Sequence, residues 1–102
     1  MLTFKGPLLT RPDDALELVS AAAAAGVDAI AVPVERLDPR FFELRNGFAG
    51  EFLQKLVNYG LRVVVVGDIS AHVARSRALA DFVRESNRGR QIRFVSDPAE
   101  IE

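Results

Sequence analysis

A run of four valines at residues 63–66 places the strongest constraint on the fold of this chain. It lies between Gly60 and Gly67 and is apolar at every position, whereas a strand with one solvated face alternates apolar and polar residues. Both faces of this strand are therefore expected to be buried, as in the parallel sheets of α/β proteins. The longer segment 46–70 predicts, in order, a helix, a turn, this strand and a polar loop.

The rest of the chain alternates predicted strands with predicted helices. Strands are expected within residues 2–9, over 27–34 and over 91–95, and the last is expected at an edge because Arg93 interrupts its apolar residues. Helices are expected up to Gly26, over 48–59 and over 71–86. The prediction is one α/β domain over residues 1–102, with a mainly parallel four-stranded sheet and three main helices.

Local signals mark where these helices begin. Thr10 followed by Asp13 resembles a capping box, and Ser70 is the expected N-cap of the third helix. Glu51 and Lys55 are four residues apart on the second helix, a spacing that predicts an ion pair.

Composition excludes several classes of site. The chain has no cysteine and one histidine, which excludes disulfides, a thiolate nucleophile and a site with several histidine ligands. We therefore expect no metal and no cofactor. The net charge of −1 gives no general attraction to nucleic acid or to anionic membranes, and no spanning segment is visible, so the expected location is the cytoplasm.

Charge is nevertheless unevenly distributed along the chain. Residues 75–93 hold six arginines against two carboxylates, a local charge of +4, and residues 97–102 carry −3. The first stretch is interpreted as a solvated helix face, with a patch for an acidic partner as the alternative.

The loop after the valine strand is the first candidate site, because ligands of parallel α/β sheets bind beyond the carboxyl ends of the strands. Asp68 can accept hydrogen bonds, Ser70 and the helix amides can hold an anion, and His72 can change its charge near neutral pH. The alternative is that Asp68 and Ser70 only cap the helix. Ser70 and His72 do not face each other on a helix, so no catalytic triad is predicted.

The start of the helix at residues 48–59 is the second candidate. Arg45, Asn46 and Gly47 precede it, and its free amides and the arginine can converge on a phosphate. The spacing is not that of a P-loop or a dinucleotide fingerprint, and the glycines also suit tight turning and close packing.

From AIAVPV at residues 29–34 onward, the order of elements resembles the STAS domain of anti-sigma-factor antagonists. That resemblance implies a regulatory, protein-binding domain. The antagonists carry a phosphorylatable serine at the start of the corresponding helix, but residues 43–50 contain no serine, threonine or tyrosine. The phosphorylation switch therefore cannot be transferred to this chain.

The strings FFELRNGFAGEFLQKLVNYG, VVVVGDIS and FVRESNRG resemble more closely a bacterial family known only as domain of unknown function 4180. The resemblance covers most of the chain and implies no activity.

Three functional hypotheses follow. The first is a regulatory or protein-binding domain without catalytic activity, and the second is a domain that binds a small anionic molecule or nucleotide with the loops beyond the strands. The third is an enzyme that uses Asp68 and His72 as acid and base. A pocket between the ends of the second and third strands favours the second hypothesis over the first. The small alanines of the first helix also predict a homodimer, because they can leave apolar surface uncovered.

Overall fold

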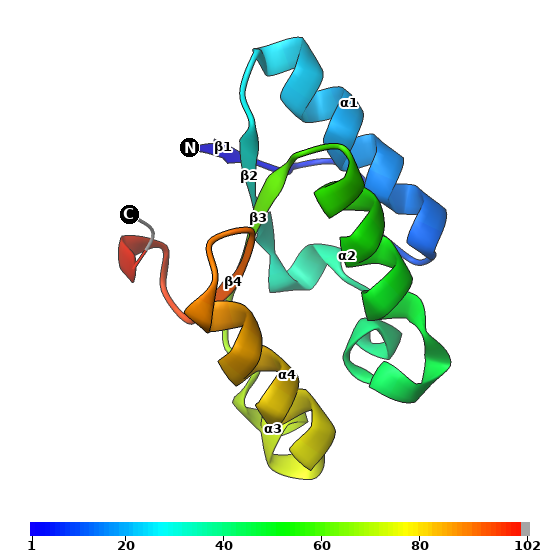
Figure 1. Ribbon diagram of the computed structural model, residues 1–102, viewed down its shortest axis with the longest axis vertical. Helices are drawn as coiled ribbons and strands as arrows, with labels where there is room; N and C mark the ends of the chain where they lie inside the picture. The colour runs from blue at the N-terminus through cyan, green and yellow to red at the C-terminus, as the bar shows by residue number, and fades with distance from the viewer. Residues whose placement is uncertain (101–102) are drawn as a thin grey trace.

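The computed structural model describes residues 1–100 of the chain. Four strands form one sheet in which every neighbouring pair is parallel: β1 (Leu2–Thr3), β2 (Ala29–Pro33), β3 (Arg62–Val66) and β4 (Ile92–Val95). The helices are α1 (Ala15–Ala25), α2 (Phe48–Asn58), α3 (Ser70–Arg75) and α4 (Arg77–Arg88) (Figure 1). The predicted α/β class and four-stranded parallel sheet are confirmed. No helix among the described residues is long and apolar enough to cross a membrane.

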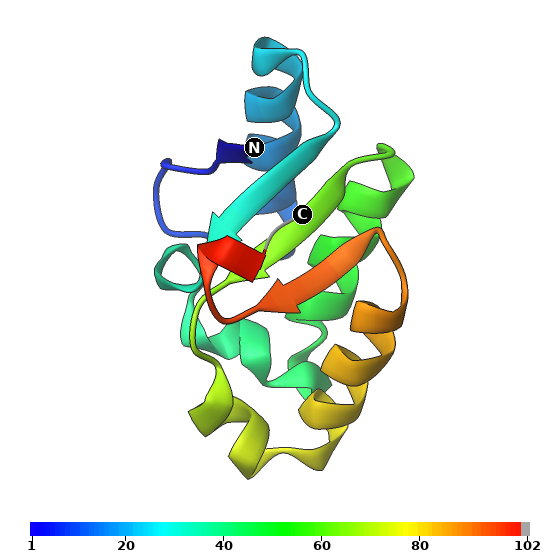
Figure 2. The same ribbon diagram turned by 90° about the vertical axis from the view of Figure 1, so that its left-hand side faces the viewer.

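The helices cover one face of the sheet. The strands stand side by side in chain order, β1-β2-β3-β4, and right-handed crossovers between successive parallel neighbours place each connecting helix on the same face. Accordingly, α1 contacts β2, α2 contacts β3 and α4 contacts β4. Figure 2 looks onto the opposite face, where the strands lie in front of the helices and a short turn, Pro98–Glu100, lies near the carboxyl ends of the strands.

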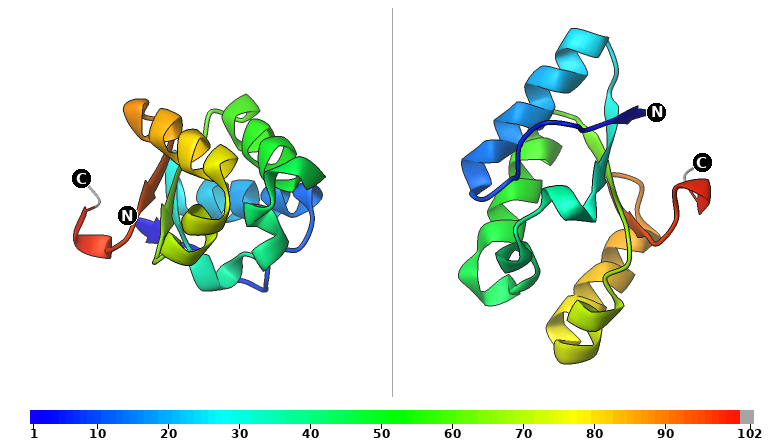
Figure 3. Two further views of the ribbon diagram at one scale, coloured as in Figure 1. Left: turned by 90° about the horizontal axis from the view of Figure 1, so that it is seen from below. Right: turned by 180° about the vertical axis from the view of Figure 1, so that it is seen from behind.

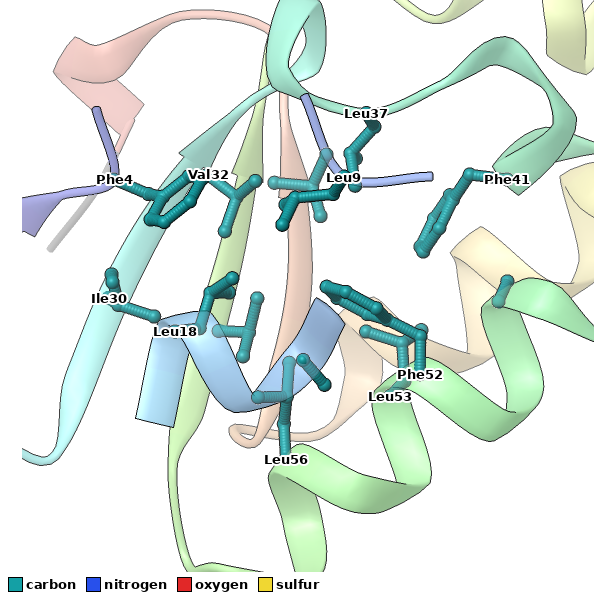
Figure 4. Close-up of a cluster of buried hydrophobic side chains, with 14 of the residues drawn as sticks. Phe4, Leu9, Leu18, Ile30, Val32, Leu37, Phe41, Phe52, Leu53 and Leu56 are labelled. Atoms are coloured by element: carbon teal, nitrogen blue, oxygen red, sulfur yellow. The ribbon is translucent and has the colours of Figure 1, made fainter. Parts of the chain in front are cut away.

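The main core lies between the sheet and its helices. Ile30 and Val32 of β2 and Val63 and Val65 of β3 point into it, together with Phe94 of β4. Figure 4 shows Ile30 and Val32 near Leu18 of α1 and side chains of α2. Core residues labelled there are Phe4, Leu9, Leu18, Ile30, Val32, Leu37, Phe41, Phe52, Leu53 and Leu56.

The opposite face of the sheet is also apolar, but its side chains do not belong to this core. Ala31, Val64 and Val95 alternate with the core residues and are buried outside the main cluster. The expectation that residues 64 and 65 are both buried is confirmed, with exposed fractions of 8% and 2%. Both faces of the central strand β3 are therefore buried, although helices cover only one face of the sheet.

The predicted third helix is wrong as a single element. The structure has two helices, α3 and α4, separated by Ser76, whose backbone is extended (φ −143°). The Ser76 side chain accepts a hydrogen bond from the Leu79 amide at 3.1 Å and so caps α4. This cap stabilises the new helix start, and the chain changes direction between α3 and α4 (Figure 2).

Two expected local contacts are replaced by neighbouring ones. The predicted capping box of Thr10 and Asp13 is not formed; Asp14 is the acidic partner, and its own amide donates to the Arg11 carbonyl at 3.0 Å. Asp14 accepts hydrogen bonds from the Thr10 and Arg11 amides, at 2.8 and 3.1 Å, which fixes the chain before α1. Lys55 lies 3.5 Å from a carboxylate oxygen of Asp13, so it links α2 to the start of α1 rather than pairing within its helix.

Candidate functional site

A cleft of about 540 Å³ opens between the segment that follows β2 and the segment that follows β3. One wall comes from two 3-10 turns, Pro39–Phe42 and Leu44–Asn46, and the other comes from α3 and the start of α4. Figure 1 and the right-hand view of Figure 3 show these segments at the same end of the molecule. The lining residues are Pro39, Phe42, Glu43, Leu44, Arg45, His72, Arg75, Ser76 and Ala78.

Contacts across the cleft fix the position of His72. Its imidazole stacks on the ring of Phe42, with centroids 4.5 Å apart and an angle of 16° between the planes. The Arg75 guanidinium lies 3.4 Å from His72 Nδ1, one turn further along α3. Phe42 itself is buried and packs edge-on against Phe41, so the imidazole rests on a part of the core.

The wall that carries Phe42 and Arg45 is anchored by side-chain hydrogen bonds. Asp38 accepts from the Arg40 backbone amide at 2.9 Å and from the Arg40 guanidinium at 3.1 Å. The side-chain hydrogen bond from Arg40 and the bond from its backbone amide lower the pKa of Asp38. Arg40 also donates to the Thr10 carbonyl at 3.3 Å, which ties this wall to the chain before α1. The lining groups are thus held in place before any ligand arrives.

The polar lining of the cleft is mainly cationic. Arg45 and Arg75 line it with one carboxylate, Glu43. No ion pair within residues 1–100 engages either arginine, whereas several arginines elsewhere are paired. A guanidinium group suits bidentate bonding to a phosphate or carboxylate, and two of them at one cleft favour an anionic ligand.

Asn46 and Gly47 lie beside the cleft rather than in its lining. The Asn46 amide donates to the Arg40 carbonyl and its oxygen accepts from the Phe48 amide, both at 2.8 Å. Gly47 has φ +81°, in the left-handed region that glycine adopts without a steric penalty. Both residues shape the backbone that leads into α2. Of the three residues predicted to hold a phosphate there, only Arg45 lines the cleft.

Asp68 and Ser70 line a different hollow, of about 340 Å³, between the start of α3 and the end of β4. Its walls are largely apolar and include Val65, Val73 and Phe94. Asp68 and His72 therefore open onto separate spaces, and the structure does not bring them together as an acid–base pair. In the described part of the chain, no group of three or more histidine, aspartate or glutamate side chains could hold a metal ion.

Comparison with known sequences identifies the family. The family model for a domain of unknown function, DUF4180, matches residues 1–102. The chain belongs to the DUF4180 family. No curated protein and no solved structure matches it. The family supplies no activity, so the function of this DUF4180 domain must be argued from its cleft.

Three residues of the DUF4180 cleft escaped the interpretation of the sequence. The sequence places Arg75 in the solvated basic stretch and Ser76 inside a continuous helix, and it gives Phe42 no role in a site. Phe42 is indeed buried, but it also supports His72 thirty residues later. The spacing of His72 and Arg75, three residues apart on one helix face, was the one signal that could have joined them.

The capping roles in the polar loop are also reversed from those predicted. Ser70 is the first residue of α3 and makes no cap, whereas the Asp68 carboxylate accepts from the Ser70 amide at 2.9 Å. Hydrogen bonds from the Ser70 side chain and amide lower the pKa of Asp68. Its contribution to stability is therefore present above the unfolded-state pKa and is lost as the pH falls through the lower folded-state pKa.

We expect Asp68→Ala to lower the melting temperature of the DUF4180 domain at neutral pH by more than Ser70→Ala, because the serine variant keeps the bond from the residue 70 amide to Asp68. The loss follows from removing the side chain that caps the start of α3. Thermal melts of both variants at neutral pH and at pH 3 provide the measurement. A Ser70→Ala variant that is the less stable of the two at neutral pH would show that the serine is the cap.

Proposed function

We propose that this DUF4180 domain binds a small phosphorylated molecule, such as a nucleotide, in the cleft between the turns at residues 39–46 and α3. The observation that carries the proposal is the convergence of Arg45 and Arg75 on one cleft that also contains His72. The volume of about 540 Å³ lies within the range of small-molecule sites, about 300–1,000 Å³.

The chemistry of the lining supports a phosphorylated ligand over an apolar one. The two guanidinium groups suit the phosphate oxygens, and Ser76 and Glu43 add polar groups for the remainder of the ligand. The stacked rings of Phe42 and His72 give the cleft a flat, partly apolar surface. The position beyond the second and third strands also matches where parallel α/β sheets bind ligands.

A regulatory role is proposed on weaker grounds. The alternation of parallel strands and helices supports a STAS-like layout, but fold analogy is a limited argument for function. A domain that binds a small molecule and, when it is bound, changes its interaction with a protein partner would combine the regulatory hypothesis with the ligand-binding one. The bacterial origin and cytoplasmic location expected from the sequence stay predictions.

Calorimetric titration with AMP, inorganic phosphate and adenosine tests the proposal. We expect AMP to bind more tightly than phosphate, and adenosine to bind least. Arg45→Ala and Arg75→Ala should each weaken AMP binding by about tenfold or more, because each removes charge-assisted hydrogen bonds.

Arg84→Ala is the matched control. It removes the same charge from α4, where Arg84 pairs with Asp81 at 2.6 Å and does not line the cleft. Its affinity for AMP should equal that of the parent. Absence of binding by all three probes, or equal weakening by all three variants, would refute the proposed site.

A further inference from the structure

The sheet face that carries no helix is unusual for a parallel sheet, because such sheets normally have both faces covered. Its centre consists of Ala31, Val64 and Val95, and two hollows of about 320 and 370 Å³ lie on either side of that centre. Figure 2 shows this face directly. The apolar centre of this face is already shielded, with exposed fractions of 2%, 8% and 7%, and the open space lies in the two hollows at the ends of the strands.

The end of this face at the amino ends of the strands is basic. Arg93 is the register partner of Val64, and it lines the larger hollow together with Arg62, Arg88 and Arg90. Two of the four have nearby carboxylates, since Arg62 lies 3.7 Å from Asp28 and Arg88 lies 3.1 Å from Glu85. Within residues 1–100, no ion pair engages Arg90 or Arg93.

The end at the carboxyl ends of the strands is acidic. Glu35 lines the smaller hollow with Ala31, Pro33, Val66 and Pro98. Asp97 precedes the turn Pro98–Glu100 at the same end, whereas Glu100 lines the hollow beside α3. A single face thus has cationic groups at one end, the Glu35 carboxylate at the other and small apolar side chains between them.

We propose that the occupant of this face is a second copy of the chain, packed with its strands antiparallel to those of the first. In such a dimer the two-fold axis lies between the two sheets and perpendicular to the strands. The arginine end of each copy then faces the Glu35 end of the other, so the same contact occurs twice in one interface. The contact covers the two hollows of each sheet. A uniformly anionic partner, such as nucleic acid or a lipid surface, would meet the carboxylate as well as the arginines. A second copy with its strands antiparallel instead places opposite charges against each other at both ends of the face.

Sedimentation over a range of micromolar concentrations tests the proposal with charge reversals. We expect the parent to form a dimer and both Arg93→Glu and Glu35→Arg to raise the dimer dissociation constant by about tenfold or more, because each creates like-charge contacts twice. Arg84→Glu, on the helix side of the molecule, is the control of equal charge change and should dimerise like the parent.

Mixing the two reversed variants gives the sharpest outcome. In the mixture, the reversed charge at position 93 of one chain meets the reversed charge at position 35 of the other, and the unchanged Glu35 and Arg93 meet in the second contact. A heterodimer should therefore form more readily than either variant self-associates. Arg90→Glu replaces Arg93→Glu if circular dichroism shows that the latter is unfolded. A parent that is monomeric throughout, a mixture that does not associate, or a monomer that binds only DNA or anionic vesicles would overturn the proposal.

Discussion

Val65→Asp is expected to leave the chain unfolded at neutral pH. Val65 is 2% exposed and points into the core between the sheet and the helices. An unpaired carboxyl group there costs about 4–7 kcal/mol, and the lost valine packing adds about 1.5–3 kcal/mol. A chain of this size has a total stability of about 5–15 kcal/mol. Far-ultraviolet circular dichroism and a thermal melt provide the measurement.

Val64→Asp is the matched control, one residue earlier on the same strand. Its side chain points to the face without helices, beside Arg93, so a carboxylate there has a guanidinium group and solvent within reach. We expect this variant to fold, with a lower melting temperature than the parent. If Val65→Asp keeps the native spectrum, or if Val64→Asp is equally damaging, the helix-covered side does not hold the main core.

Phe41→Ala is expected to have the second largest effect, a loss of about 3–5 kcal/mol in the free energy of unfolding. The Phe41 ring is 1% exposed and makes edge-on contacts with Phe42, Phe48 and Phe52, at centroid distances of 5.1, 5.4 and 5.7 Å. Its removal leaves a cavity beneath one wall of the cleft. Urea unfolding at neutral pH measures the loss.

Leu44→Ala provides the comparison for Phe41→Ala. Leu44 lies in the same wall but is only partly buried, so its truncation should cost less than half as much. If the variant retains the fold, Phe41→Ala should also weaken AMP binding, because Phe42 and the His72 ring lose their support. Equal stability losses from the two truncations would contradict a central role for Phe41 in the core.

The sequence predicted those elements whose signals are local. Residues 63–66 are apolar at every position, so β3 was identified with its buried faces, and Gly26 ended α1 as expected with φ +69°. The break at Ser76 was missed because the apolar positions of residues 71–86 fit one continuous helix, and a serine inside a helical pattern is a weak signal.

The candidate site was predicted only in part, because it depends on contacts between distant segments. Arg45 and His72 were both singled out, but as members of two separate sites. Their proximity follows from the stacking of His72 on Phe42, thirty residues apart, which no spacing in the sequence specifies. Asp68 and Ser70 were placed correctly beyond β3 but open onto another hollow.

The most direct test of the proposed ligand site is a titration of the isotopically labelled chain with AMP, followed by nuclear magnetic resonance. We predict saturable chemical-shift changes at Arg45, His72, Arg75 and Ser76, with Arg84 and the helix-free sheet face unchanged. No saturable change at these cleft residues, or changes confined to the arginines at residues 88–93, would contradict the proposal that this DUF4180 domain binds its ligand in the cleft.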